Sequence, residues 1–264
     1  LVVDCEKNLM LPKLEDQSVY YSRQLHLYNF KVVCILPTKR LGNILHLTED
    51  ERPRGSSEII SMMYNSLMSL DLEGMKTIRL SSNGCGGKTK NITMIGMGTA
   101  WLNQAPSHVT NITLDFPVTG HSFLPPDHVF GIIECKIWQH QEILQKEYTD
   151  IIAKHSKVRR LGKDWQTFDW KSAVVDVIKS PGSLHFQISK AKKVLIHREQ
   201  ERLMSVESLH TYWKLSMGKR SLDMETDSQI RPKQQPVSFP VNAKKVSNIA
   251  KLLQKHFGDD WRQD

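Results

Sequence analysis

The order of strand-like and helix-like segments is the feature that most constrains how this chain of 264 residues can fold. Segments rich in β-branched and aromatic residues come first, and segments with apolar residues at helical spacing then alternate with short strand-like ones. Strands in succession, followed by strands that alternate with helices, predict a mixed sheet covered by helices. The expected elements are strands at 1–4, 20–36 and 43–48, a helix that Ser56 caps, a strand at 76–81, a helix at 92–102, a strand at 109–116 and a helix from Pro126 to His155.

The remaining residues predict smaller additions to this α/β core. A helix-like stretch at 169–178 and strand-like stretches at 185–188 and 194–196 indicate a small basic α+β extension. The polar stretch that follows has mixed charges and few apolar residues, which is typical of a flexible linker. We therefore divide the chain into a core at 1–160, an extension at 161–217, a linker at 218–238 and a C-terminal helix at 239–264.

Composition favours a protein of the nucleus or cytoplasm. No run of about 18 apolar residues occurs, so we expect no membrane-spanning helix and no membrane partner. The four cysteines lie far apart without a C-x-x-C pair, which favours reduced thiols over a disulfide framework or a structural zinc site. The chain opens on Leu1 inside a strand-like segment and shows no signal peptide. We therefore expect that it is not secreted and that further chain precedes it.

Basic residues concentrate in the second part of the chain. Residues 1–135 contain 12 Lys and Arg against 13 Asp and Glu, whereas the remaining residues contain 24 against 15, and the net charge is +8. Such a distribution is typical of a protein whose C-terminal part faces a polyanion. The alternative is a solvated, lysine-rich helical surface that has no partner.

Acidic and polar residues from distant segments are expected to converge at one edge of the predicted sheet. Asp4 ends the first strand, Asn83 follows the strand at 76–81, and Asp127 and Glu134 lie on the helix after the last strand. Phosphodiester cleavage with two Mg²⁺ ions needs two or three carboxylates at such a point, one of them bridging both ions. The sequence has an amide, Asn83, where this chemistry would use the second carboxylate.

Five spaced blocks of the sequence resemble a single protein family. They lie at 4–9, 20–25, 54–59, 85–91 and 120–134. Over roughly residues 1–200 the chain is similar to transposon-derived proteins of insects and other animals, which have a core like that of DDE transposases and are often described only as a domain of unknown function. The resemblance implies a ribonuclease-H-like fold, whose order of elements matches the predicted one. It also implies a site for Mg²⁺ or Mn²⁺ at Asp4, at the position of Asn83, and at Glu134 or Asp127.

The loop at 82–91 departs from the family pattern Ser-Asp-x-Cys-x-Gly-Gln-Asn-Lys-Asn. Asn83 replaces the Asp, and Lys88 and Thr89 replace the Gln-Asn pair. An amide carries no charge with which to hold two dications, and a lysine nearby opposes them. Both departures indicate a catalytically degenerate copy.

Several of these residues also have a simpler structural interpretation. Asn83 with Gly84 is typical of a turn, because both residues tolerate positive φ. Asp127 follows two prolines and fits a helix N-cap, which we favour over metal ligation, so Glu134 is the preferred third acid. His121 fits contact with a phosphate or a metal, and equally fits a structural role in a tight turn.

These features together predict a transposable-element-derived protein that has lost catalysis and at most binds DNA. It needs no small-molecule cofactor, uses Mg²⁺ or Mn²⁺ only if it is active, and could form a homodimer. One alternative is an active nuclease or strand transferase in which Asp127 or Glu6 replaces the missing acid. Another is a protein-interaction scaffold that reuses the fold. The residues expected to contact nucleic acid are Arg54, Lys88, Lys90, His121, Arg159, Arg160, Lys190, Lys192 and Lys193.

Overall fold

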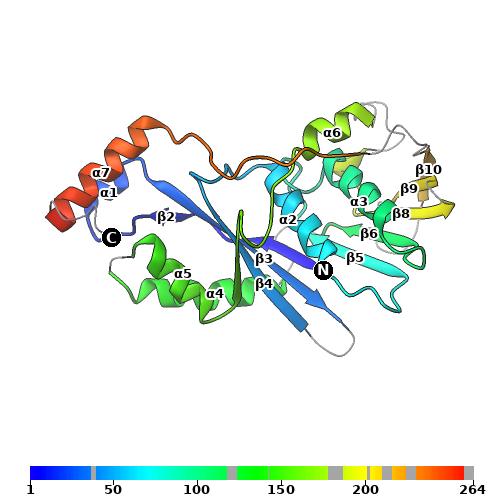
Figure 1. The fold of residues 1–264 in the computed structure, drawn as a ribbon. Helices are drawn as coiled ribbons and strands as arrows, with labels where there is room; N and C mark the ends of the chain where they lie inside the picture. The colour runs from blue at the N-terminus through cyan, green and yellow to red at the C-terminus, as the bar shows by residue number, and fades with distance from the viewer. Residues whose placement is uncertain are drawn as a thin grey trace.

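The computed structural model of the protein describes residues 1–36, 40–117, 124–141, 143–177, 187–200, 203–209, 216–223 and 230–258. Within these residues the chain forms one ten-stranded mixed sheet, with helices on both of its faces (Figure 1). The predicted α/β class, with a mixed sheet flanked by helices, is therefore confirmed.

The bounds of the elements agree with most of the expected segments and add several others. The strands are β1 (Val2–Cys5), β2 (Leu9–Leu11), β3 (Leu25–Ile35), β4 (Arg40–Thr48), β5 (Thr77–Ser82), β6 (Asn111–Asp115), β7 (Lys157–Arg160), β8 (Lys193–Gln200), β9 (Leu203–Leu209) and β10 (Ser216–Asp223). The helices are α1 (Gln17–Tyr21), α2 (Ser56–Met68), α3 (Ile92–Gln104), α4 (Pro125–Trp138), α5 (Gln145–Ala153), α6 (Trp170–Val177), the short 3₁₀ helix η2 (Ile188–Lys190) and α7 (Ala243–Phe257).

The central strands of the sheet follow the order β4-β3-β1-β5-β6. β1 pairs antiparallel with β3, and β3 with β4, whereas β1, β5 and β6 run parallel to one another. The chain passes through α2 before β5 and through α3 before β6, as parallel neighbours require a crossover. Parallel strands end at the same edge of a sheet, so the residues that follow β1 and β5 meet there.

Alternate side chains of β3 divide the core into two layers. Phe30 and Val32 belong to a large cluster with the apolar residues of α2 and α3. Leu27 points to the opposite face and packs with Ile133 and Ile152 from α4 and α5. Figure 1 shows α2, α3 and α6 on one side of the sheet and α4 and α5 on the other. Because both faces are covered, β3 is apolar along most of its length.

The single helix predicted from Pro126 to His155 is wrong, because α4 and α5 divide this segment. Between them Ile143 is buried and exchanges two backbone hydrogen bonds with Lys13, at 2.9 and 3.0 Å. An N–H group that bonds to Lys13 in this way cannot also bond to the carbonyl four residues earlier, so the helix is interrupted.

The strand predicted at 20–36 begins five residues later than expected. Its first part is the end of α1, which Asp16 caps by accepting the N–H of Ser18 at 2.7 Å. Ser22 then ends the helix, and β3 starts at Leu25.

The extension and the linker differ from the prediction in their relation to the sheet. β8 pairs antiparallel with β6, β9 with β8 and β10 with β9, so all three strands continue the same sheet. β10 occupies residues that we expected to begin a flexible linker. Further along, Ile230 is buried, and the carbonyl of Lys233 accepts the N–H of Asp169 at 2.8 Å. The predicted strand at 185–188 lies partly outside the described residues, and Ile188 begins η2 instead.

Candidate functional site

β1 and β5 place the first two residues of the predicted site side by side. The strands pair in parallel with Val3 opposite Ser82, so Asp4 and Asn83 come next at the same edge of the sheet. The side chain of Asn83 donates a hydrogen bond from Nδ2 to Oδ1 of Asp4 at 3.1 Å. The backbone N–H of Cys5 donates to the same oxygen at 2.8 Å. One carboxylate oxygen of Asp4 thus accepts two hydrogen bonds from the protein.

The first turn of α4 brings Asp127 to this pair. The predicted N-cap at Asp127 is wrong, because the N-cap of α4 is Leu124 and Asp127 is the third residue of the helix. From there its Oδ2 accepts the N–H of Leu124 at 2.8 Å. Its carboxyl also lies beside that of Asp4, close enough to share a hydrogen bond. The same side chain therefore bonds to the start of the helix and contacts Asp4.

The pKa of the Asp4 carboxyl is raised from 3.8 to about 6. Burial is the largest cause, because it disfavours the charged form, and Asp127 adds to it through a hydrogen bond and through charge repulsion. The hydrogen bonds from Cys5 and Asn83 act in the opposite direction, because they stabilise the carboxylate. Asp4 and Asp127, which we call the acidic pair, therefore take up a proton at mildly acidic pH.

The loop that carries Asn83 is fixed by side-chain hydrogen bonds at both ends. The hydroxyl of Thr89 donates to the carbonyl of Asn83 at 2.5 Å. Asn91 caps α3, because its Oδ1 accepts the N–H of Met94 at 3.1 Å. Two residues of the 82–91 motif thus hold the loop against the end of the sheet, independently of any role in chemistry.

Ser56 supports the same loop and does not cap α2. The N-cap position belongs to Gly55, and the Ser56 hydroxyl donates to the carbonyl of Lys88 at 2.9 Å. The predicted N-cap at Ser56 is therefore wrong by one residue, because the hydroxyl bonds to the loop and not to its own helix.

Glu134 lies two turns further along α4 and makes different contacts. It forms an ion pair with Lys7 at 2.9 Å between Oε1 and Nζ. Its charge also contributes to a pKa of about 7 for Glu6, for which burial is the largest cause. The preferred third acid of the sequence thus lies beside Lys7 and Glu6, whereas Asp127 lies beside Asp4.

Two basic residues predicted to contact nucleic acid lie close to the thiol of Cys5. Arg54 and Lys88 both act on the thiol of Cys5, the neighbour of Asp4, and lower its pKa. Burial outweighs them and raises the pKa of Cys5 to about 11, so the thiol stays protonated at neutral pH. Arg54 also lies over the rings of Tyr28 and Phe30, which pack with α2 and α3, whereas Asp127 approaches Asp4 from α4.

Four more of the predicted basic residues lie in the loop or near the start of β8. Lys90 donates from Nζ to the carbonyl of Ser189 at 2.7 Å, and its pKa is lowered first by burial and then by the charge of Lys192. Lys190 is exposed, whereas Lys193 forms an ion pair with the acid that ends β6, at 3.4 Å. Lys90, Lys190 and Lys192 therefore form a basic group close to the loop.

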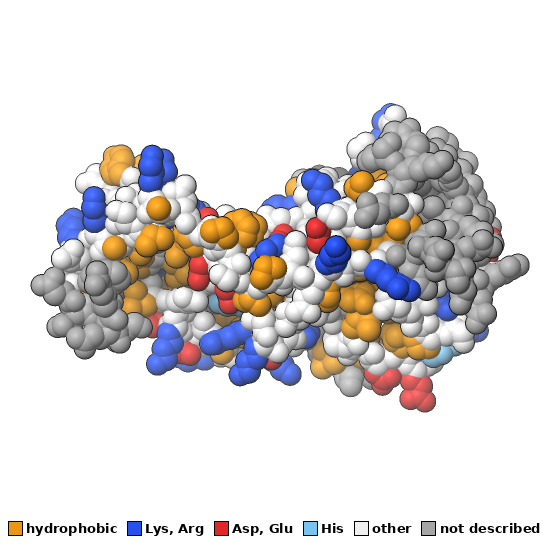
Figure 2. All heavy atoms as spheres, turned by 45° about the horizontal axis from the view of Figure 1, so that its top comes forward, with side chains coloured by type: hydrophobic (Ala, Val, Ile, Leu, Met, Phe, Trp, Pro, Cys, Tyr) orange, Lys and Arg blue, Asp and Glu red, His pale blue; other side chains and the backbone are white. Residues whose placement is uncertain are grey.

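The remaining predicted contacts lie elsewhere. Arg159 and Arg160 lie on β7, beyond β3 and β4 from the acidic pair, and Arg159 donates to the carbonyl of Asp164 at 2.6 Å. His121 lies outside the described residues. On the face drawn in Figure 2, Lys and Arg side chains form several separate groups and not one continuous stripe.

A buried polar network on the α4 and α5 face was missed in the sequence. Asn29 of β3 donates to Glu6 at 2.6 Å, and His46 of β4 bonds to Asn29 at 3.0 Å. A polar residue at the same face position in each of two paired, apolar strands is the signal that could have revealed it.

Asp4, Asn83 and Asp127 do not fit a site for two Mg²⁺ ions. They supply two carboxylates, and Nδ2 of Asn83 presents a donor to Asp4 where a metal site needs acceptors. Among the residues that the structure describes, no three or more His, Cys, Asp and Glu side chains are grouped as metal ligands. What these residues can do is share a proton and exchange hydrogen bonds.

The fold and the site define an α/β protein with an acidic pair between the end of strand β1 and the first turn of α4. No family model, curated protein or solved structure matches the chain. None of the helices in the described ranges combines the length and the apolar composition that crossing a bilayer requires. The functional argument therefore depends on the geometry of the site.

Proposed function

We propose that this chain is a transposase-derived protein with a ribonuclease-H-like core, which no longer cuts DNA and binds it through phosphate contacts. The hydrogen bond from Asn83 to Asp4 carries the proposal. It places an amide beside the first acid, at the edge where two parallel strands end, which is the place of the second carboxylate in a two-metal nuclease.

The strand order supports the ribonuclease-H-like part of the proposal. In such a core the first acid comes from the first strand, the second from the end of the strand after the first long helix, and the third from a late helix. Asp4, Asn83 and Asp127 occupy these three places, on β1, after β5 and on α4. By its contact with Asp4, Asp127 fits the third place better than Glu134.

The charge at the site supports the loss of catalysis. A carboxylate about 4 Å from a unit charge contributes about 4 kcal/mol at an effective dielectric constant near 20, and a bridging carboxylate acts on two dications. Asn83 forfeits this attraction for both ions.

The basic group of Lys90, Lys190 and Lys192 supports DNA as the polyanion. Lysines in the loop before α3 and just before β8 can neutralise phosphates without reading bases, and such binding weakens steeply with salt. Fluorescence anisotropy with a labelled duplex, measured across a salt series, is the test of binding. The double variant Lys90→Gln with Lys192→Gln should reduce the magnitude of the slope of log K against log salt by about 2.

A matched control for this experiment is Lys76→Gln. Lys76 is exposed and precedes β5, so it lies at the opposite end of that strand from Asn83. It should leave the salt slope unchanged. Absence of salt-sensitive binding by the unmodified chain would refute DNA binding and favour a scaffold role.

The variant Asn83→Asp tests the loss of catalysis. Mn²⁺ should raise the melting temperature of this variant and leave that of the parent chain unchanged, because only the variant has a third carboxylate at the site. Plasmid nicking by the parent chain that requires a divalent ion, and that Asp4→Ala abolishes, would show that catalysis survives.

A further inference from the structure

A polar cavity of about 280 Å³ lies on the α4 and α5 face of the sheet, between β4, β7 and α5. None of its lining residues belongs to the acidic pair or to the loop that follows β5. The residues that line it are His46, Glu51, Gln145, Lys146, Thr149 and Arg160.

The buried network fixes which nitrogen of His46 faces this cavity as an acceptor. Asn29 donates from Nδ2 to the Glu6 carboxyl at 2.6 Å, so its Oδ1 is left as an acceptor. That oxygen lies 3.0 Å from Nδ1 of His46, which must therefore carry the proton. Nε2 of the neutral ring is consequently an acceptor. The assignment applies to the ionised form of Glu6, because both carboxylate oxygens then act only as acceptors.

His46 lines the cavity, and the residue is only 4% exposed. Because Asn29 engages Nδ1, Nε2 is the ring nitrogen left for a ligand. Burial and the charge of Arg160 lower its pKa to about 4, so the ring stays neutral at physiological pH. A buried acceptor that opens onto a polar cavity fits a ligand that brings an N–H or O–H group.

The charges of the cavity favour a ligand with one negative charge. Lys146 and Arg160 are positive, Glu51 is negative and His46 is neutral, so the lining carries one net positive charge at pH 7. Glu51 is partly committed elsewhere, because its Oε2 accepts the N–H of Thr48 at 2.8 Å. The N-terminal end of α5, a helix of nine residues, adds the positive end of its dipole.

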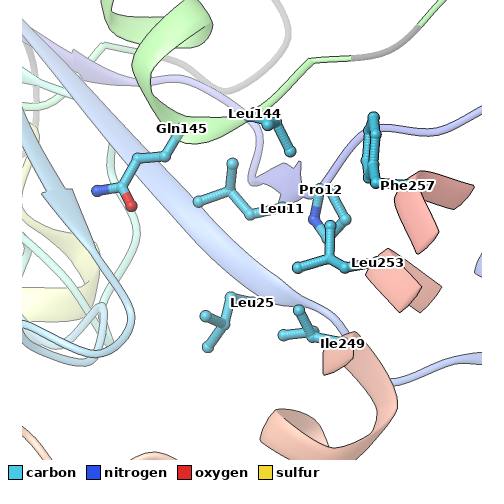
Figure 3. A pocket seen from close by; sticks show the side chains of 8 residues that line it. All are labelled: Leu11, Pro12, Leu25, Leu144, Gln145, Ile249, Leu253 and Phe257. Atoms are coloured by element: carbon cyan, nitrogen blue, oxygen red, sulfur yellow. The ribbon is translucent and has the colours of Figure 1, made fainter. Parts of the chain in front are cut away.

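An apolar pocket of about 210 Å³ adjoins this cavity at Gln145, which lines both. Figure 3 shows the Gln145 amide at one side of the pocket, pointing away from the apolar side chains that form the rest of it. An apolar cavity of about 150 Å³ is enough to hold a benzene ring. The other residues that line the pocket are Leu11, Pro12, Leu25, Leu144, Ile249, Leu253 and Phe257.

We propose that the two adjoining cavities bind a carboxylate that carries a neighbouring N–H group and an apolar side chain. The carboxylate lies against Lys146, Arg160 and the start of α5, the N–H donates to Nε2 of His46, and the apolar side chain enters the pocket beside Phe257. An N-acylated amino acid and the C-terminal residue of a peptide share this chemistry. The site is independent of the proposed function, because it uses none of the residues around Asp4.

Isothermal titration calorimetry with N-acetyl-L-phenylalanine tests the proposal on the full chain. A ligand of this size should bind with a Kd on the order of 0.1–1 mM. N-acetyl-L-phenylalaninamide lacks the charge, N-acetylglycine lacks the ring, and 3-phenylpropionate lacks the N–H. Each of these should bind about tenfold more weakly or not at all.

Two substitutions separate the polar and apolar cavities. Arg160→Gln should weaken binding of N-acetyl-L-phenylalanine about tenfold, as should Phe257→Ala, whereas Lys154→Gln at the exposed end of α5 should not. Both Arg160 and Phe257 are exposed enough for the variants to fold, which circular dichroism melting verifies. Arg160→Gln should not weaken the amide, since that probe has no charge to lose.

A short peptide that ends in phenylalanine distinguishes the two sources of the ligand. Tighter binding than N-acetyl-L-phenylalanine assigns the site to peptide C-termini, and equal or weaker binding assigns it to free acylated amino acids; both results support the proposal. No heat of binding for any carboxylate probe at about 10 mM would overturn it. Equal binding by folded Arg160→Gln and by the parent chain would overturn it as well.

Discussion

Asp4→Asn should stabilise the metal-free protein at neutral pH and have no effect at low pH. An asparagine at this position reproduces the protonated form of the acid. Its Oδ1 can accept from Cys5 and Asn83 as the carboxylate does, and its amide can donate to Asp127. The substitution thus removes the negative charge while it retains the hydrogen bonds.

The magnitude follows from the shifted pKa of Asp4. Burial is the main cause of the rise from 3.8 to about 6, and each pKa unit corresponds to 1.36 kcal/mol, which sets an upper bound of about 3 kcal/mol that solvent screening of this partly exposed side chain lowers. The folded state binds the proton more tightly than the unfolded state, so stability falls as pH rises from about 4 to about 6. Above that range the parent chain bears the whole destabilisation, and Asp4→Asn relieves it.

Urea unfolding at pH 4 and at pH 7.5 measures this difference directly. The variant should gain up to about 3 kcal/mol in the free energy of unfolding over the parent chain at pH 7.5 and nothing at pH 4. Asp150→Asn, an exposed residue of α5, is the matched control and should change neither value. A gain that is the same at both pH values would refute the titration argument, and a loss at pH 7.5 would show that the charge stabilises the fold.

The remaining predictions concern packing and the second buried acid. A Cβ on Gly96 would lie 2.4 Å from Cγ2 of Val174, so Gly96→Ala should push α3 away from α6 and lower the free energy of unfolding by about 1–3 kcal/mol. In thermal melting, adding Val174→Ala to the same chain should recover part of that loss. Glu6→Gln should raise stability at pH 8 but not at pH 4, because burial raises the pKa of Glu6 from 4.5 to about 7. Urea unfolding at both pH values measures this, and a variant less stable than the parent chain at pH 8 would contradict the prediction.

Local pattern was sufficient for the centre of the sheet. β3 has β-branched and aromatic residues, and α2 and α3 have apolar residues at helical spacing, because each element is buried within one layer. The local sequence pattern therefore predicts these elements directly. The convergence of Asp4 and Asn83 could also be predicted, because parallel neighbours end at one edge. Strands β8 and β9 are different, because β8 pairs with β6, far away in the sequence, and β9 follows by pairing with β8, while their polar residues conceal the pattern.

The choice between Asp127 and Glu134 could not be made from spacing. Residues seven apart lie on nearly the same face of a helix, so both point toward the sheet, about 10 Å apart along the axis. Which turn lies over Asp4 depends on where α4 begins relative to the end of β1. The hydrogen bond from the N–H of Leu124 to Asp127 fixes the start of α4, and from the sequence Asp127 is only a plausible cap.

Asn83 has opposite consequences for the folded state and for chemistry. A carboxylate at this position would bring a third negative charge to Asp4 and Asp127, and in the absence of a cation it would raise the free energy of the folded state. The amide instead donates to Asp4 and stabilises its charge. The same contact fills the space in which a bridging ligand would act. A chain that carries Asn83 can therefore keep the edge of its sheet intact without a metal ion, as the proposed loss of catalysis requires.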